Sequence, residues 1–131
     1  MAIAHFTLAT SDVEGTARFL EQTLRYQRKA RPANSPVETV WLDAGEGQEL
    51  HVVFVEFFSV SPFEGEFGRH FAVTHASADY QALRDRLGAA GAEAIEPLRP
   101  SGVERFFFRD PVNGYVFEVI NRESLIANRR S

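Results

Sequence analysis

The chain has 131 residues, a formal net charge of −4 and no cysteine. Hydrophobic residues make up 44% and charged residues 24%, which are ordinary values for a globular protein and exclude wholesale disorder. The length suits one compact domain. Without cysteine, disulfides, thiolate nucleophiles, zinc fingers and iron–sulfur clusters are excluded, so a metal site would have to use imidazole and carboxylate groups.

The charge pattern and hydropathy also limit the partners. The sequence has no basic stripe, so we do not expect it to bind nucleic acid. No apolar run approaches the roughly 20 residues that a membrane span requires. The N-terminus lacks the basic and apolar regions of a signal peptide. These features predict a cytoplasmic protein that does not enter membranes.

The first half of the chain predicts one helix among four strands. Apolar and alternating runs predict strands at 3–9, 26–30, 37–43 and 50–57. Ser11 and Asp12 supply N-cap side chains for a helix that extends to Leu24. One face of this helix is apolar and is formed by Val13, Ala17, Leu20 and Leu24.

The second half repeats this order after a segment rich in proline and glycine. Strands are predicted at 69–75, 93–95, 103–109 and 115–120. Ser77 is the expected N-cap of the second helix, and Gly91 ends it. The buried face of that helix is predicted to contain Tyr80, Leu83 and Leu87.

Two β-α-β-β-β units in tandem predict an α+β fold in which two modules with mixed, curved sheets form a cupped cleft. We expect a single domain with module 1 at about 3–57, a linker at 58–68 and module 2 at about 69–121. The polar C-terminal tail, 122–131, is expected to be a solvated helix or a frayed end.

Three histidines and one glutamate occupy matched places in the two repeats. His-Phe opens each repeat, at His5 and at His70, and a second candidate ligand follows 46 residues later at His51 and 48 residues later at Glu118. Glu118 lies on an apolar strand face, where an unpaired carboxylate costs several kcal/mol. Two imidazoles and a carboxylate from separate strands suit Fe(II), Mn(II), Ni(II) or Zn(II). We therefore predict a divalent metal site.

Two other polar residues have simpler explanations. A histidine in a strand is more often a hydrogen-bonded core residue than a ligand, and His75 lies outside the predicted ligand register. We therefore expect His75 to be a surface or structural residue. Asp110 precedes Pro111, Asn113 and Gly114, and this composition explains it as a turn former.

Four segments carry a resemblance to a known family. They are His5-Phe6-Thr7-Leu8, Glu49-Leu50-His51-Val52, Arg69-His70-Phe71-Ala72-Val73 and the stretch from Phe108 to Glu118. Together they resemble the vicinal oxygen chelate superfamily, which includes glyoxalases, fosfomycin-resistance and bleomycin-resistance proteins and extradiol dioxygenases. The resemblance extends from Ile3 to about Asn121, and the final turn and strand are its most specific part.

The resemblance implies paired modules around a metal, in a homodimer. By position it implies that His5, His70 and Glu118 are metal ligands, as in the dioxygenase and fosfomycin-resistance branches. His51 falls on the fourth position, where glyoxalase I typically carries a glutamate. His51 is therefore expected to be a fourth ligand or a catalytic base beside Glu118, and the full glyoxalase mechanism is not carried over.

The predicted function is that of a metal-dependent glyoxalase-like enzyme, of lyase or isomerase type, that acts on a small substrate with vicinal oxygens. Phe54, Phe106 and Phe108 are candidate substrate contacts, although most of the phenylalanines are expected to form core and dimer interface. Arg105 is a candidate anchor for an anionic substrate, although an arginine at such a position is more often a surface residue. The alternatives are a non-catalytic drug-binding protein of the bleomycin-resistance type and an extradiol-type dioxygenase.

Overall fold

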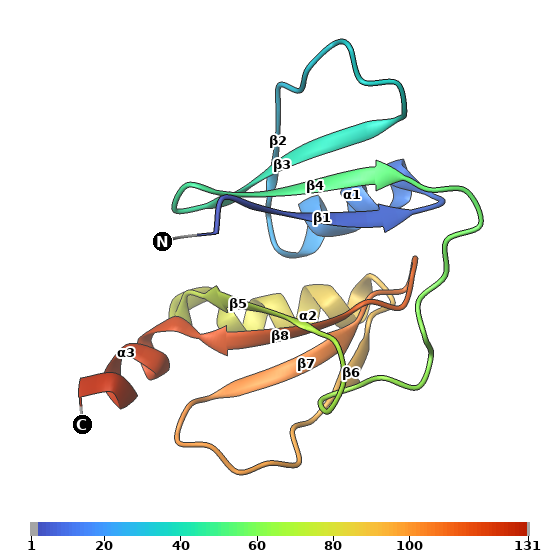
Figure 1. Cartoon of the computed structure of the whole chain (residues 1–131). Coiled ribbons are helices and arrows are strands. Elements are labelled where there is room, and N and C mark those ends of the chain that lie inside the picture. The colour runs from blue at the N-terminus through green and yellow to red at the C-terminus, as the bar shows by residue number, and fades with distance from the viewer. Residues whose placement is uncertain (1–2, 131) are drawn as a thin grey trace. The chain divides into compact units, whose positions relative to one another are not determined.

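This computed structural model describes residues 3–130. The chain forms two compact units, Met1–Ser59 and Val60–Ser131, called here the first and the second unit. Each unit contains a four-stranded mixed sheet and a helix that packs against it (Figure 1). The fold is therefore α+β with two β-α-β-β-β modules, as the sequence predicts.

The first unit begins with β1 (His5–Thr10), continues through α1 (Val13–Thr23) and ends with three strands. These are β2 (Gln27–Lys29), β3 (Thr39–Gly45) and β4 (Gln48–Phe54). The strand order is β1-β4-β3-β2, with β1 parallel to β4 and the other pairs antiparallel. The strand predicted at 50–57 begins and ends earlier, because the turn before it closes at Gly47 and Phe57 has a left-handed φ of 61°.

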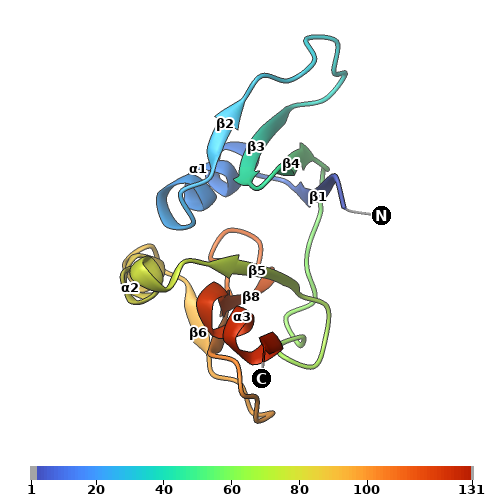
Figure 2. The same cartoon turned by 90° about the vertical axis from the view of Figure 1, so that its left-hand side faces the viewer.

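Helix α1 determines which face of the first sheet is buried. Asp12 is its N-cap and accepts a hydrogen bond from the Gly15 N–H at 2.9 Å. All four residues of the predicted apolar face are buried. On the sheet, the buried side chains that alternate toward this helix include Leu8, Leu42 and Val52. Within the described part of this unit, the opposite face of the sheet carries no helix (Figure 2).

The second unit repeats this plan with β5 (Phe71–His75), α2 (Tyr80–Ala89), β6 (Glu93–Ile95), β7 (Arg105–Arg109) and β8 (Val116–Asn121). The strand order is β5-β8-β7-β6, with β5 parallel to β8. Phe106, Phe108, Phe117 and Val119 are buried in its core. Helix α2 buries the predicted face, and Gly91 follows it with a left-handed φ of 90°.

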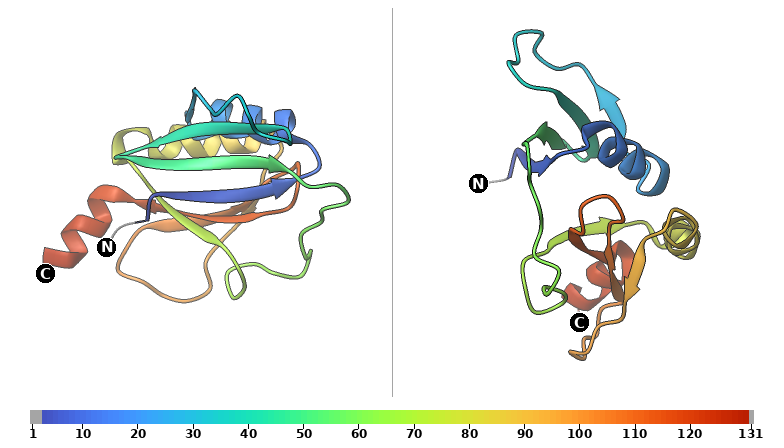
Figure 3. Two further views of the ribbon diagram at one scale, coloured as in Figure 1. Left: turned by 45° about the horizontal axis from the view of Figure 1, so that its top comes forward. Right: turned by 90° about the vertical axis from the view of Figure 1, so that its right-hand side faces the viewer.

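The start of α2 differs from the prediction. A single turn of 3-10 helix, Ser77–Asp79, precedes it, and Ser77 does not cap the helix. Instead the Ser77 N–H donates to Glu123 at 2.6 Å, so this residue contacts the C-terminal segment. That segment forms α3 (Arg122–Arg130), which extends from the end of β8 (Figure 3). No helix among residues 3–130 is long and apolar enough to cross a membrane.

Candidate functional site

Three aromatic rings form a stack on the helix-free face of the first sheet. The imidazole of His51, on β4, lies between His5 on β1 and Trp41 on β3. Its centroid is 4.1 Å from that of His5, with an angle of 15° between the planes, and 4.0 Å from that of Trp41, with an angle of 2°. Only 8% of His51 is exposed. The fold therefore brings His5 and His51 together, as rings in face-to-face contact.

A carboxylate holds one edge of the His51 ring. His51 Nε2 lies 2.9 Å from Glu49 Oε1, and the other oxygen of Glu49 forms an ion pair with Lys29. Hydrogen bonds from Lys29 and then from His51 hold the pKa of the Glu49 carboxyl below its ordinary value. Sequence reasoning did not single out Glu49. Strand alternation was the available signal, since residues two apart on a strand share a face.

The second unit contains the other predicted pair, His70 and Glu118. His70 immediately precedes β5, and Glu118 lies in the middle of β8. His70 Nε2 is 3.3 Å from Glu118 Oε1, and His70 Nδ1 is 3.2 Å from the carbonyl oxygen of Gly68. The Glu118 side chain is 12% exposed. Each ring nitrogen of His70 therefore faces an oxygen atom.

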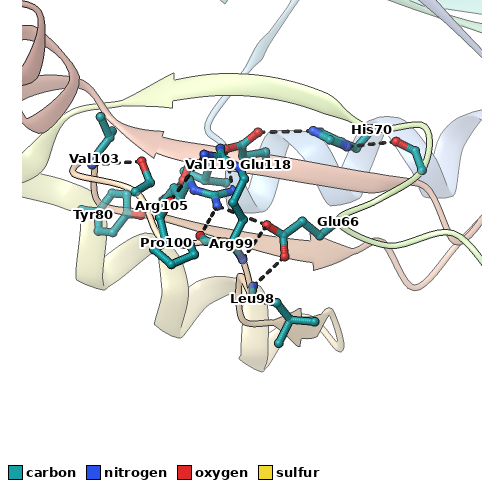
Figure 4. A network of polar contacts seen from close by, with 12 residues as sticks. Glu66, His70, Tyr80, Leu98, Arg99, Pro100, Val103, Arg105, Glu118 and Val119 are labelled. Atoms are coloured by element: carbon teal, nitrogen blue, oxygen red, sulfur yellow. Dashed lines mark hydrogen bonds and ion pairs between the residues drawn. The ribbon is translucent and has the colours of Figure 1, made fainter.

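Arg105 connects Glu118 to a second carboxylate (Figure 4). Its Nη1 donates to Glu118 Oε2 at 3.3 Å, and its Nη2 donates to Glu66 Oε2 at 3.1 Å and to the carbonyl oxygen of Arg99 at 2.8 Å. The side chains of Arg105 and Glu66 are 4% and 7% exposed. The expectation of a surface arginine is therefore wrong: Arg105 is a buried cation between two carboxylates.

Glu66 also fixes the loop before β7. Its carboxylate accepts hydrogen bonds from the backbone N–H groups of Leu98 at 2.6 Å and Arg99 at 3.3 Å. The Leu98 N–H is the main cause that lowers the pKa of Glu66, and Arg105 adds to the effect. Glu66 belongs to the segment predicted as a linker, and no local sequence pattern indicated this role.

The phenylalanines predicted as substrate contacts have different positions. Phe106 and Phe108 are 2% and 1% exposed, and they pack in the core against Tyr80 and Phe117. Phe107 lies on the opposite face of β7, where its ring meets that of His70 edge-on at 5.1 Å. Phe107 is therefore the aromatic residue beside the His70–Glu118 pair.

The remaining candidates also have clear positions. Phe54 is 36% exposed at the end of β4. His75 Nε2 forms a hydrogen bond with Asp79 Oδ2 at 2.8 Å, which agrees with the expected structural role. Asp110 is 4% exposed and accepts hydrogen bonds from the N–H groups of Val112, Asn113 and Tyr115. The structure thus confirms it as the residue that shapes the β7–β8 turn.

The donor set fits a metal in part. Within residues 3–130, no three histidine, aspartate or glutamate side chains are gathered closely enough to hold an ion. What the structure contains is a pair in each unit. The pair in the second unit has two donor atoms side by side, whereas the pair in the first unit is stacked.

The comparisons with known proteins identify the family. Residues 2–119 match the Glyoxalase/Bleomycin resistance protein/Dioxygenase superfamily. The chain belongs to this superfamily, as the resemblance of its motifs predicts. A search of curated proteins gave no match.

Solved structures share the fold at low sequence identity. A fosfomycin resistance protein, FosX, from Mesorhizobium loti is 19% identical, with a TM-score of 0.70, and the match covers 99% of this chain and 98% of that chain. A glyoxalase family protein from Bacillus anthracis is 21% identical, with a TM-score of 0.74 and coverage of 92% and 94%. A point mutant of FosX from Listeria monocytogenes, in complex with Mn(II) and 1S,2S-dihydroxypropylphosphonic acid, is 20% identical, with a TM-score of 0.72 and coverage of 96% and 97%.

Proposed function

We propose that this protein is a metal-dependent, glyoxalase-like enzyme of lyase or isomerase type that acts on a small substrate with vicinal oxygens. The metal is a divalent ion such as Mn, Fe, Ni or Zn, and its proposed ligands are His70 and Glu118 of the second unit. The relative from Listeria that contains Mn(II) and a vicinal diol supports both parts of the proposal. We keep the cytoplasm as the predicted location of this protein.

The His70–Glu118 pair is the observation that carries this proposal. The Gly68 carbonyl can only accept a hydrogen bond, so the neutral His70 ring donates from Nδ1 and directs its Nε2 lone pair toward Glu118. A lone pair and a carboxylate oxygen 3.3 Å apart repel each other unless a proton or a cation lies between them. Two donors bound to one metal at about 2.1 Å are roughly 3.0 to 3.4 Å apart, so the observed separation suits a shared ion.

The local charge also favours a cation. Glu66 and Glu118 carry two negative charges, and Arg105 supplies one positive charge between them. The cluster therefore has a surplus of one negative charge in a largely buried place, where a cation is attracted more strongly than in water. Arg105 bonds only one oxygen of Glu118 and leaves the other toward His70.

A bound metal would supply Lewis acidity, which polarises a carbonyl or chelates two neighbouring oxygens of the substrate. The chain's own residues would provide the setting. Arg105 holds Glu118 in one orientation, and Phe107 covers one edge of His70 with an apolar ring. This arrangement restricts both donors to few rotamers, which reduces the entropy lost when a ligand binds.

The test is the metal content of protein purified without chelator, measured by plasma mass spectrometry. We expect about one divalent ion per chain in the wild type and its loss in His70→Ala. His75→Ala is the matched control, because this histidine lies in the same unit but is bonded to Asp79. A wild-type protein that contains no metal and cannot be reconstituted would overturn the proposal. If the wild type does bind metal, a panel of thiol-adduct, epoxide and catechol substrates distinguishes lyase activity from dioxygenase activity in the metal-loaded protein.

The ring stack of the first unit favours a second candidate, a non-catalytic small-molecule binder of the bleomycin-resistance type. Trp41, His51 and His5 offer aromatic surface on a sheet face without a helix, and flat ligands bind such surfaces. This candidate predicts ligand binding that is independent of metal. Isothermal titration with and without chelator separates it from the enzyme.

We also propose that the protein forms a homodimer. Phe63, Phe67 and Leu98 of the second unit are 93%, 73% and 81% exposed, and Phe57 of the first unit is 90% exposed. Large apolar side chains exposed in such numbers favour association with another surface. Light scattering after size-exclusion chromatography should give a mass near 29 kDa, which is twice that of the 14.7 kDa chain. A mass of one chain at micromolar concentration would contradict the dimer.

A further inference from the structure

The sequence predicts that His51 is either a fourth metal ligand or a catalytic base. The contacts around its ring oppose the role of metal ligand. The planes of His5 and His51 are 15° apart with centroids at 4.1 Å. Rings stacked in this way keep their in-plane lone pairs in two separate planes that are nearly parallel. Lone pairs in such planes do not converge on one ion at about 2.1 Å, so the two rings cannot share a metal while the stack persists.

Two contacts oppose rotation of His51 out of this stack. Trp41 covers the other face of the ring at 4.0 Å, with its plane only 2° away from parallel. Glu49 holds Nε2 at 2.9 Å. A rotation of the His51 ring out of the stack would lose two aromatic contacts and one charge-assisted hydrogen bond.

The partner of Nε2 also determines where the ring proton lies. An ionised carboxylate only accepts hydrogen bonds, so the neutral His51 ring carries its proton on Nε2 and its lone pair on Nδ1. Glu49 is fixed in turn, because Lys29 pairs with its other oxygen. In this set of three side chains, Glu49 is the acceptor and both Lys29 and His51 donate to it.

From these contacts we infer that Glu49, held by Lys29, is a positioning residue that fixes the tautomer and the ring plane of His51 and keeps His51 out of the metal's ligand set. His51 then presents Nδ1, as a hydrogen-bond acceptor, to whatever small molecule lies against the stack. The inference deepens the proposed function, and it rests on that function only for the statement about the metal.

Substitution of Glu49 by glutamine tests the order of donors. Lys29 can only donate, so it should retain the carbonyl oxygen of the new amide. The amide NH2 group then faces His51 Nε2 and donates to it, which requires the ring proton to move to Nδ1. Glu49→Gln should thus invert the tautomer of His51. In Lys29→Met with Glu49→Gln the amide is free to turn, and a mixture of tautomers is expected.

The measurement is the pattern of two- and three-bond proton–nitrogen couplings of the His51 ring in 15N-labelled protein without metal. The pH should be about two units above the ordinary histidine pKa of about 6.5, where a free imidazole is neutral. His75, whose Nε2 also faces a carboxylate, is an internal reference in the same spectrum. Emission from Trp41, the single tryptophan, reports whether the stack survives each substitution. Glu21→Gln, which alters an ion pair with Arg28, is the matched control and should leave His51 unchanged.

Two results would overturn the inference. One is a wild-type His51 protonated on Nδ1, and the other is a Glu49→Gln variant with an unchanged tautomer. Metal affinity provides a further test. His51→Gln should change the dissociation constant for Mn(II) by less than about threefold, whereas replacing even the hydrogen-bond partner of a ligand typically costs 10- to 100-fold. A loss as large as that of His70→Ala would place His51 among the ligands. If the wild type binds no metal, the proposed function fails, and the tautomer pattern still decides the role of Glu49.

Discussion

The two units of this protein use the same topology but treat their polar residues differently. In the first unit, Lys29 and Glu49 form a partly exposed ion pair beside a ring stack, with side chains that are 41% and 26% exposed. In the second unit, Arg105 lies 4% exposed between Glu66 and Glu118. A repeated fold thus contains one partly exposed polar cluster and one buried polar cluster. Side chains at matched positions of the two units therefore differ in their chemistry because their neighbouring side chains differ, although their strand register is the same.

The largest expected effect is that of removing the buried cation. Arg105→Leu leaves the carboxylates of Glu66 and Glu118 without their shared partner, and breaking a buried ion pair in this way costs about 3 to 5 kcal/mol of unfolding free energy. Chemical denaturation of wild type and variant gives this difference. Lys29→Leu in the first unit is the matched control. Equal losses in the two variants would remove the contrast between the units.

The next effect concerns the hairpin turns before the fourth strand of each unit. Asp110→Ala leaves three backbone N–H groups of the β7–β8 turn without their acceptor and should cost about 2 to 4 kcal/mol. The matching turn of the first unit relies on residues with positive φ, and among the described residues Asp43 accepts there a single backbone hydrogen bond, from the Gly45 N–H at 2.8 Å. Asp43→Ala should therefore cost less than about 1 kcal/mol. A loss of similar size in both variants would contradict this reading.

A smaller effect depends on pH. Arg86 and then His75 hold the pKa of Asp79 below its ordinary value of 3.8. Since the folded-state pKa is lower, the stabilisation is complete above the unfolded value and is lost as the pH falls below it. Asp79→Asn should cost under about 1 kcal/mol at pH 7, because this side chain is 43% exposed. The difference between wild type and variant should shrink in denaturation series run toward pH 3, and a difference that grows would show the opposite sign.

The smallest expected effect on stability is that of Lys29→Met. Its ion pair with Glu49 is exposed and should leave the melting temperature within about 1 °C of the wild type, because surface pairs contribute little. The same variant releases Glu49 and should alter the ring signals of His51 in the nitrogen spectrum. A spectral change without a change in melting temperature would sharpen the contrast with Arg105, where stability and site are coupled.

Much of the fold follows from local patterns in the sequence. Alternation and turn residues predicted all eight strands, and the apolar face of α1 is buried as expected. Capping was less predictable: Ser77 has the composition of an N-cap, but its side-chain Oγ accepts a hydrogen bond from Asn121 Nδ2 at 3.3 Å, 44 residues later. A distant donor that the fold brings near competes with the helix N–H groups for the cap oxygen, and local sequence does not record that competition.

The candidate site, like the fold, was predictable from the sequence only in part. By itself the sequence determined which residues share a strand face, because side chains alternate with a period of two. It therefore placed His5 with His70, and His51 with Glu118, at matched positions of the two repeats. Only the tertiary structure decided their partners: Arg105 meets Glu66 across 39 residues of sequence, and Trp41 closes the stack on His51 from a neighbouring strand. Burial and hydrogen bonding depend on such distant neighbours, and they determine whether a matched residue faces a carboxylate or an aromatic ring.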